Sequence, residues 1–404
     1  MLKHWIWLAS RRGIGTHGRA ALLRLFGTAK NIYELNREQC LKTRGFDQRW
    51  LEPILDKDTS DAEKILLDCD NRGFSIMTYA DEIYPERLRN IPDPPVLLYY
   101  EGTVPEFDEE AVIAVVGTRR CSAYGLLHAK QFSKMIAASG GIVLSGGARG
   151  ADTMALQSAL ETGMPVVCVF GCGLDITYPK ENKRLFEEVA HRGCLISEYP
   201  PGTPPEGMNF PPRNRILSGL SVGVLVVEAP IKSGALITAN YALEQGRDVY
   251  TIPGNIDTRN CEGNNHLLKE GAELVMDGWD LMQNYIYQFP DKIVDGRSKE
   301  AIENMFMLRY GRAVPVYSPV IGAAADDKKP VDKTETNAYS ENNSPPSLTE
   351  DENTVFNELS EEPIHADTLV SRSGLPSQRV MAALTMLQIK GLTEKRSGNY
   401  YVKK

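Results

Sequence analysis

Seven apolar runs recur between about residues 105 and 285, and stretches long enough for helices separate them. Most of the runs are short, continuous and rich in Val and Ile, as expected of parallel strands that are buried on both faces. They are Ala111–Val116, Ile142–Ser145, Val166–Phe170, Cys194–Ser197, Val222–Val227, Val249–Ile252 and Glu273–Met276. With crossover helices in stretches such as Thr153–Thr162 and Lys180–Arg192, the alternation predicts a doubly wound, Rossmann-like α/β domain over residues 71–290.

Glycine-rich turns follow four of these runs. Glycine lets the backbone turn tightly and brings N–H groups close to a ligand, and a helix N-terminus adds a partial positive charge. Because ligands of such sheets bind at the carboxyl ends of the strands, the turns should gather into one phosphate-binding surface. Either a nucleotide or a nucleic-acid backbone could occupy it. The turn residues that we assign to this surface are Gly117, Thr118, Arg119, Arg120, Gly146, Gly147, Arg149, Lys232, Ser233, Gly234, Gly254 and Asn255.

Further basic residues lie between the turns, with aromatic residues such as Tyr178 and Phe210 interleaved. The first set, Lys180, Lys183 and Arg184, would by itself more often be an ordinary solvated helix face. The second set follows two prolines and begins an expected helix of the same domain. Single-stranded DNA requires this mixture of charge neutralisation and base stacking. The additional candidates are Lys180, Lys183 and Arg184 in the first set, and Arg213, Asn214 and Arg215 in the second.

The formal net charge of -8 is unusual for a nucleic-acid binder, but its location resolves the conflict. Residues 326–367 contain 12 Asp and Glu against 3 Lys and Arg, a net charge of -9. The rest of the chain therefore carries a net charge of +1, which leaves room for a basic face.

Two classes of enzyme are alternatives to nucleic-acid binding. A dinucleotide fingerprint is absent, because Gly171-x-Gly173 has Ile176 where the third glycine should stand, and no Walker A sequence occurs. A hydrolase would need a general base, and several carboxylates lie near the turns. Their spacing reveals neither a carboxylate pair nor a Ser/His/Asp arrangement, so we expect no catalytic residues. The carboxylates considered were Asp152, Asp175, Glu198, Glu228 and Glu244, with Asp152 and Asp175 expected as caps of helices or turns.

The sequence predicts neither a metal nor a cofactor. The seven cysteines are odd in number, scattered and without a Cys-x-x-Cys pair, and the six histidines show no paired spacing. Buried reduced thiols are the expected state, which favours a cytoplasmic protein. The apolar run Trp5–Ala9 is too short for a signal peptide, and no run is long enough for a membrane span.

Three further regions flank the α/β domain. Residues 1–70 are expected to form short helices, and the glycine hairpin Gly13–Gly18 is typical of a helix-hairpin-helix or SAM-like module, for phosphate contact or for packing. Residues 291–351 are expected to be a linker, mostly disordered and acidic. Residues 352–404 predict a winged helix, with a helix over Ser377–Lys390 and a hairpin over Leu392–Val402. Its acidic residues favour a role in protein contact over DNA contact.

The motifs together resemble the DNA-processing protein A family, also called DprA or Smf, over nearly the whole chain. The matching blocks are Tyr84–Gly102, Val116–Arg119, Ser145–Asp152, Gly171–Asn182, Asn209–Ser221, Lys232–Ala239 and Gly246–Ile256. The resemblance implies an extended Rossmann-like domain that binds single-stranded DNA, forms a homodimer and passes the DNA to the RecA recombinase in natural transformation, without known catalysis. It also implies that Arg119 contacts phosphate, and that Lys180, Lys183 or Arg184 supplies a second basic contact.

An alternative is a nucleotide-processing enzyme of a related fold, similar to the phosphoribohydrolases. Those enzymes carry a Pro-Gly-Gly-x-Gly-Thr-x-x-Glu loop. The corresponding segment, Lys232–Thr238, lacks both the paired glycines and the glutamate. We therefore expect a DNA-binding recombination mediator and not an enzyme.

Overall fold

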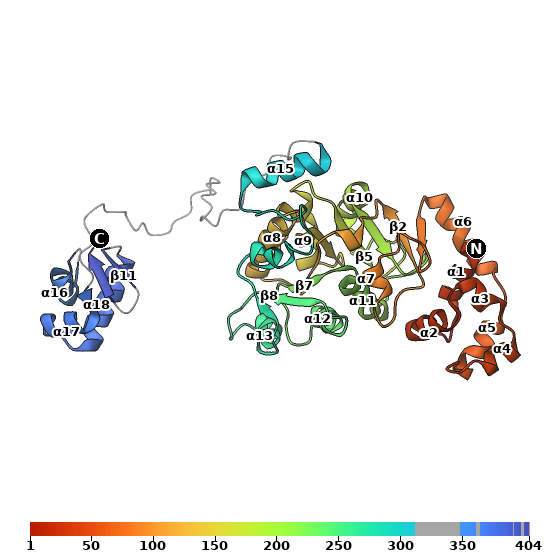
Figure 1. Ribbon diagram of the computed structural model, residues 1–404, viewed down its shortest axis with the longest axis horizontal. Helices are drawn as coiled ribbons and strands as arrows, with labels where there is room; N and C mark the ends of the chain where they lie inside the picture. Colours follow the sequence, from red (N-terminus) through yellow and green to blue (C-terminus); the bar gives the residue numbers. More distant parts are fainter. Residues whose placement is uncertain (312–347, 361–363, 391, 397–399, 404) are drawn as a thin grey trace, which may run out of the picture. The chain divides into compact units, whose positions relative to one another are not determined.

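The structure is a computed structural model that describes residues 1–311, 348–360, 364–390, 392–396 and 400–403 (Figure 1). The chain divides into two units, Met1–Ala324 and Ala325–Lys404, which are described separately. The first unit contains both the N-terminal helices and the predicted α/β domain.

Six short helices precede the sheet, as the sequence predicts for residues 1–70. They are α1 (Leu2–Ser10), α2 (Thr16–Phe26), α3 (Ala29–Glu34), α4 (Arg37–Lys42), α5 (Leu51–Leu55) and α6 (Ser60–Arg72). The glycine hairpin before α2 packs on the α/β domain, because the Thr16 hydroxyl donates a hydrogen bond to Asp93 Oδ2 at 3.1 Å. This contact favours the packing interpretation of the hairpin over phosphate contact.

The α/β domain is built on a nine-stranded sheet in the order β1-β2-β6-β5-β4-β3-β7-β8-β9. All seven predicted strands are present, and they pair in parallel from β6 to β9. Two strands that the apolar runs did not predict, β1 and β2, extend one edge in antiparallel pairing. The bounds are β1 (Ser75–Thr78), β2 (Leu97–Gly102), β3 (Val112–Val116), β4 (Ile142–Ser145), β5 (Val166–Phe170), β6 (Cys194–Ser197), β7 (Gly223–Val226), β8 (Asp248–Thr251) and β9 (Glu273–Leu274).

Helices cover both faces of the sheet, since alternate residues of the central strands belong to different apolar cores. In β3, Ile113 and Val115 contribute to one core, whereas Val112, Ala114 and Val116 contribute to the other. The first core also holds buried residues of α8 (Ala123–Ala138), α9 (Ala151–Leu160) and α10 (Lys183–Arg192). The second holds residues of α11 (Phe210–Leu220), α12 (Gly234–Glu244) and α13 (Glu262–Lys269). This is the doubly wound arrangement that the sequence predicts.

The strand order reverses next to β3. The chain runs from β3 through β4 and β5 to β6 on one side, and from β7 through β8 to β9 on the other. In open sheets of this type, the crevice at the carboxyl ends of the two central strands is where ligands bind. Two small helices, α7 (Glu86–Arg89) and α14 (Gly278–Met282), complete the domain.

The first unit continues beyond the predicted boundary at residue 290. Helix α15 (Lys299–Tyr310) buries Ile302, Met305 and Phe306. Arg309 donates to both carboxylate oxygens of Glu110 and to the Gly140 carbonyl oxygen. The assignment of this stretch to a linker was therefore wrong, because its apolar face has a core to pack against. Residues 312–347 of the predicted linker lie outside the described residues.

The second unit forms a winged helix. Helices α16 (Glu350–Glu358), α17 (Ala366–Ser373) and α18 (Ser377–Ile389) pack with a three-stranded sheet of order β10-β12-β11. The strands are β10 (Ile364–His365), β11 (Thr393–Arg396) and β12 (Tyr400–Lys403). Val380, Leu384 and Leu387 of α18, predicted to share one face, are all buried in its core. Thr349 caps α16 through a hydrogen bond from the Glu352 N–H, so the unit starts slightly before residue 352.

All seven cysteines are free thiols, of which only Cys121 is partly exposed. Burial raises the pKa of every one of them, to about 11 for Cys69 and about 12 for Cys121. Across the described ranges, no group of three His, Cys, Asp or Glu residues is placed to hold a metal ion. None of the described helices combines the length and apolar character needed to cross a bilayer.

Candidate nucleic-acid interface

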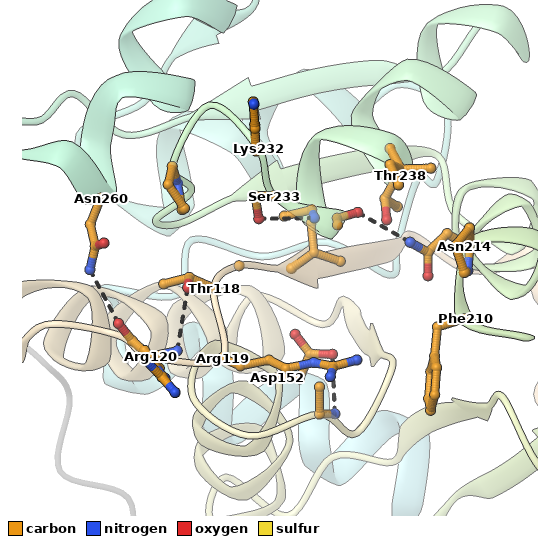
Figure 2. A pocket seen from close by; sticks show the side chains of 18 of the residues that line it. Thr118, Arg119, Arg120, Asp152, Phe210, Asn214, Lys232, Ser233, Thr238 and Asn260 are labelled. Atoms are coloured by element: carbon orange, nitrogen blue, oxygen red, sulfur yellow. Dashed lines mark hydrogen bonds between the residues drawn. The ribbon is translucent and has the colours of Figure 1, made fainter. Parts of the chain in front are cut away.

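A cavity of about 740 Å³ opens where the strand order reverses. Loops that follow β3, β4 and β7 line it, together with the first turns of α11, α12 and α13. Figure 2 shows two facing walls, with Thr118, Arg119 and Arg120 on one side and Lys232 and Ser233 on the other. A volume of this size suits a small ligand or a short piece of a polymer.

The first wall is the turn from Gly117 to Arg120. Glycine is needed at Gly117, because a Cβ there would lie 2.6 Å from the Cβ of Ala151. The turn is held from within and from outside. The Arg120 N–H donates to the Thr118 hydroxyl, and the Arg120 carbonyl oxygen accepts from Asn260 Nδ2 at 3.1 Å. The side chains of Arg119 and Arg120 remain exposed. Two cations therefore stand on a fixed backbone at the mouth of the cavity.

An aromatic ring lies beside these cations. Phe210 begins α11, and its ring centroid is 5.2 Å from the guanidinium carbon of Arg119 and 5.8 Å from that of Arg213. The ring of Tyr178 lies 5.7 Å away. These distances are typical of cation–π contact. The partly exposed Phe210 offers a surface on which a nucleobase could stack next to a phosphate-binding arginine.

The second wall is the start of α12. Ser233 caps this helix by accepting a hydrogen bond from the Ala235 N–H, and Asn214 Nδ2 donates to the Gly234 carbonyl oxygen at 3.2 Å. Lys232 is exposed next to the cap. The helix N-terminus and the lysine both favour an anion on this side. The cavity can therefore hold negative charge from two directions.

Asp152 and Arg213 form the floor between the walls. Asp152 is only 5% exposed, and its Oδ2 accepts a hydrogen bond from the Ala148 N–H. Burial raises the pKa of this carboxyl to about 6, against the opposing effect of the Arg213 guanidinium. Arg213 is itself buried and donates to the carbonyl oxygens of Gly146 and Val169. It thus fixes the second glycine turn to the end of β5.

Comparison with known proteins decides the family. The sequence profile described as DNA recombination-mediator protein A matches residues 75–286, and the DprA winged helix domain profile matches residues 340–399. Protein Smf of Synechocystis is 31% identical over 402 residues, which span 98% of each chain. The chain belongs to the DNA recombination-mediator protein A family. This confirms the resemblance drawn from the sequence motifs.

One further family member extends the comparison, both in sequence and in structure. The DNA processing protein DprA of Streptococcus pneumoniae is 44% identical over 215 residues, covering 53% of this chain and 74% of the relative. The X-ray structure of the S. pneumoniae DprA matches with a TM-score of 0.60 at 33% identity, over 70% of this chain and 98% of that one. The matched profile of the recombination-mediator family contains the whole cavity described above.

Half of the predicted site residues line the cavity of this chain. They are Gly117, Thr118, Arg119, Arg120, Arg213, Asn214, Lys232, Ser233 and Gly234. The lining does not include Gly146, Gly147, Arg149, Lys180, Lys183, Arg184, Arg215, Gly254 or Asn255. Gly146 supports the cavity from behind by accepting a hydrogen bond from Arg213, and Arg149 is paired with Glu181.

Arg215 is the clear correction among the predicted DNA contacts. It is 1% exposed and paired with Glu198 at 2.7 Å and Asp93 at 3.1 Å. A buried guanidinium with two carboxylate partners cannot meet a phosphate, so Arg215 stabilises the fold.

Sequence reasoning missed several lining residues, including Pro230, Ile231, Thr238, Asn260 and Glu262. One signal was present for Thr238, which stands one helical turn after Gly234 on the same face of α12. No comparable signal marks Asn260, because its place depends on how the loop after β8 folds back toward Arg120.

Proposed function

We propose that this chain is a single-stranded DNA-binding recombination mediator that works without catalytic turnover. The observation that carries the proposal is the contact of Arg119 with Phe210 at the mouth of the cavity. One residue can neutralise a phosphate while its neighbour stacks on the attached base. Membership of the recombination-mediator family supports the same conclusion.

The preference for single strands follows from Phe210. A base must turn one face toward the ring, and bases in a duplex are stacked on each other and paired. Removing a base from a duplex costs a few kcal/mol. Because base faces are alike, we expect little dependence on sequence.

The absence of turnover is part of the proposal. The cavity lining contains no His or Cys among the described residues. Of its two carboxylates, Asp152 already accepts a backbone hydrogen bond, and Glu262 lies in the first turn of α13. This arrangement supports binding more readily than the paired nucleophile and base that a hydrolase needs.

Family membership motivates the wider role. We propose that the protein acts in the cytoplasm as a homodimer and passes bound DNA to the RecA recombinase, as in natural transformation. Size-exclusion chromatography with light scattering tests the dimer. A strand-exchange assay with RecA tests the transfer, and we expect the lag before strand exchange to shorten when the protein is added. A lag of unchanged length would contradict the transfer.

The central experiment is a titration of labelled single-stranded oligonucleotide, with the matching duplex beside it. We expect tighter binding of the single strand and a steep fall of affinity with salt, with a slope of roughly 0.7 per neutralised phosphate. A hydrolysis assay on nucleoside monophosphates in the same preparation addresses the phosphoribohydrolase alternative. Equal affinity for duplex, or release of free base at a catalytic rate, would refute the proposal.

A further inference from the structure

A carboxyl group occupies the place where a phosphate would bind in many folds of this kind. Glu228 follows β7 and is completely buried. Its Oε2 accepts a hydrogen bond at 2.8 Å from the N–H of Ser122, the residue that caps α8. Its carbonyl oxygen accepts from the Thr118 N–H at 2.6 Å. Glu228 therefore ties both ends of the turn that carries Arg119 and Arg120.

The carboxyl group fits tightly against the first turn of α8. A Cβ at Gly125 would overlap Glu228 Oε2, so glycine leaves room for the carboxylate. The second oxygen, Oε1, is buried and has no hydrogen-bond partner among the described residues. The charge of Glu228 adds to burial in raising the pKa of the neighbouring Cys121 thiol to about 12. The carboxylate is thus placed at the helix end, although its hydrogen-bonding capacity is not filled there.

The N-terminus of α8 is the natural anion site of this sheet. It is the first helix after the first parallel strand, and in doubly wound folds the phosphate of a nucleotide binds there. In this chain the anion at that position belongs to the protein. A phosphate cannot share the site, because the space is taken and the like charge repels it.

We propose that Glu228 is a built-in anion that excludes phosphate from the N-terminus of α8. It directs backbone phosphates to Arg119, Arg120 and Lys232 on the cavity walls instead. The N-terminus of α8, which Glu228 joins to the turn that lines the cavity, thereby rejects inorganic phosphate and the phosphate of free mononucleotides. The inference rests on the proposed function and deepens it, since it names which anions are kept away from the turn that carries Arg119.

The first test measures thermal unfolding during titration with inorganic phosphate at constant ionic strength. The proteins are the wild type, Glu228→Ala, Glu228→Gln and the double variant Glu228→Ala with Arg119→Ala. A ligand that binds only the folded state raises the melting temperature. We expect a phosphate-dependent rise in Glu228→Ala that persists in the double variant. Glu228→Gln should respond like the wild type, because its side chain still fills the site.

A response of Glu228→Ala no larger than that of the wild type would overturn the inference. So would a response that vanishes with Arg119, because the phosphate would then sit at the cavity mouth and not at α8. These readings do not use DNA. A wild type that fails to bind single strands would overturn the proposed function alone.

The second test covers the case in which Glu228→Ala does not fold. Glu228→Gln retains an acceptor for Ser122 and removes only the charge, so the turn should keep its shape. Single-stranded DNA should then bind about twofold to fivefold more tightly at low salt, because the negative charge behind the turn that carries Arg119 no longer repels the phosphates. Unchanged or weaker binding would mean that Glu228 acts as a clamp of the turn and not as an anion.

Discussion

Arg215 donates hydrogen bonds to both carboxylate oxygens of Glu198, from Nη1 at 2.9 Å and from Nη2 at 2.7 Å. Its Nε also donates to the carbonyl oxygen of Asp93. The side chain of Asp93 in turn accepts a hydrogen bond from the Thr16 hydroxyl. One buried arginine thus joins α11, the end of β6 and the N-terminal helices. The contact replaces the DNA contact that the sequence predicted for this residue.

Removing Arg215 should destabilise the protein strongly. Arg215→Met leaves the buried carboxylates of Glu198 and Asp93 without their partner, at a cost of about 3–5 kcal/mol of unfolding free energy. The matched control is Arg297→Met, since Arg297 forms an exposed pair with Asp295 and should change stability by less than about 1 kcal/mol. Urea unfolding measures both. Equal midpoints for the two variants would contradict the buried role.

Arg119→Ala should weaken DNA binding with little change in stability. The side chain is exposed and its described contact is with Phe210, so we expect a change in unfolding free energy within about 0.5 kcal/mol. The salt slope of single-stranded DNA binding should fall by about 0.7 as one phosphate contact is lost. Arg49→Ala, which removes an arginine paired with Asp47 in the N-terminal helices, is the control. A slope that falls equally in the control would mean that only net charge matters.

Phe210→Leu should remove a stacking surface. We expect single-stranded DNA to bind about 1–3 kcal/mol more weakly, as for other stacked bases. Oligonucleotides with an abasic tract should bind the wild type less well, but should lose little further affinity with Phe210→Leu, because the two changes remove the same contact. Tyr287→Ala, at a ring that is 96% exposed, serves as the control. If the losses of affinity from the abasic tract and from Phe210→Leu were additive, the base would not stack on Phe210.

Asp152 predicts a dependence of stability on pH. Its folded-state pKa of about 6 lies above the ordinary value of 3.8, so the protonated form is favoured in the folded state. Its contribution to stability is full below pH 3.8 and is lost as pH rises through 6. Relative to Asp152→Asn, the wild type should therefore lose stability on the order of 3 kcal/mol between about pH 4 and 7. Single-stranded DNA binding should weaken over the same window, as a negative charge develops beside Arg213. If the unfolding free energies of the wild type and of Asp152→Asn changed with pH in parallel, the role of Asp152 would be refuted.

Truncation after Gly322 should leave single-stranded DNA affinity within about twofold of the full chain. Every residue that lines the cavity precedes this point. In the winged helix, Arg379 of α18 is paired with Asp351, and Lys390, which caps the C-terminus of α18, is paired with Glu352. These carboxylates of α16 lower the attraction of the two basic side chains for phosphate. Fluorescence anisotropy with both proteins measures the difference. Loss of most of the affinity would move the DNA site away from the glycine turns.

The central parallel strands β3 to β7 were predictable because they are buried on both faces, and their runs of Val, Ile and Leu reflect that burial. Strands β1 and β2 escaped, since they pair antiparallel at one edge and β1 is only partly buried. Helix α15 was missed because it lies after residue 290, where the alternation of strands and helices ends, although it contains the apolar run Met305–Leu308. The helix belongs to this unit because Ile302, Met305 and Phe306 pack into its core, a contact that the local sequence does not reveal.

The site was half predictable for a related reason. Glycine turns after parallel strands must meet at one edge, so the sequence placed Gly117–Arg120 and Lys232–Gly234 together. It could not tell which way a helical arginine points. Arg213 and Arg215 stand two residues apart on α11, and one lines the cavity whereas the other lies in a buried ion pair. Glu228 could be recognised as a carboxylate at a strand end, but its partner Ser122 is 106 residues away in the sequence.

The seven thiols have a practical consequence for measuring DNA binding by fluorescence. A thiol reacts with a maleimide as its thiolate, and burial leaves every native cysteine with a raised pKa and, apart from Cys121, without access to solvent. A cysteine introduced at an exposed position such as Ile256, whose side chain is 84% exposed, would react far faster. The natural chain can thus carry a single fluorophore without first having its own cysteines replaced.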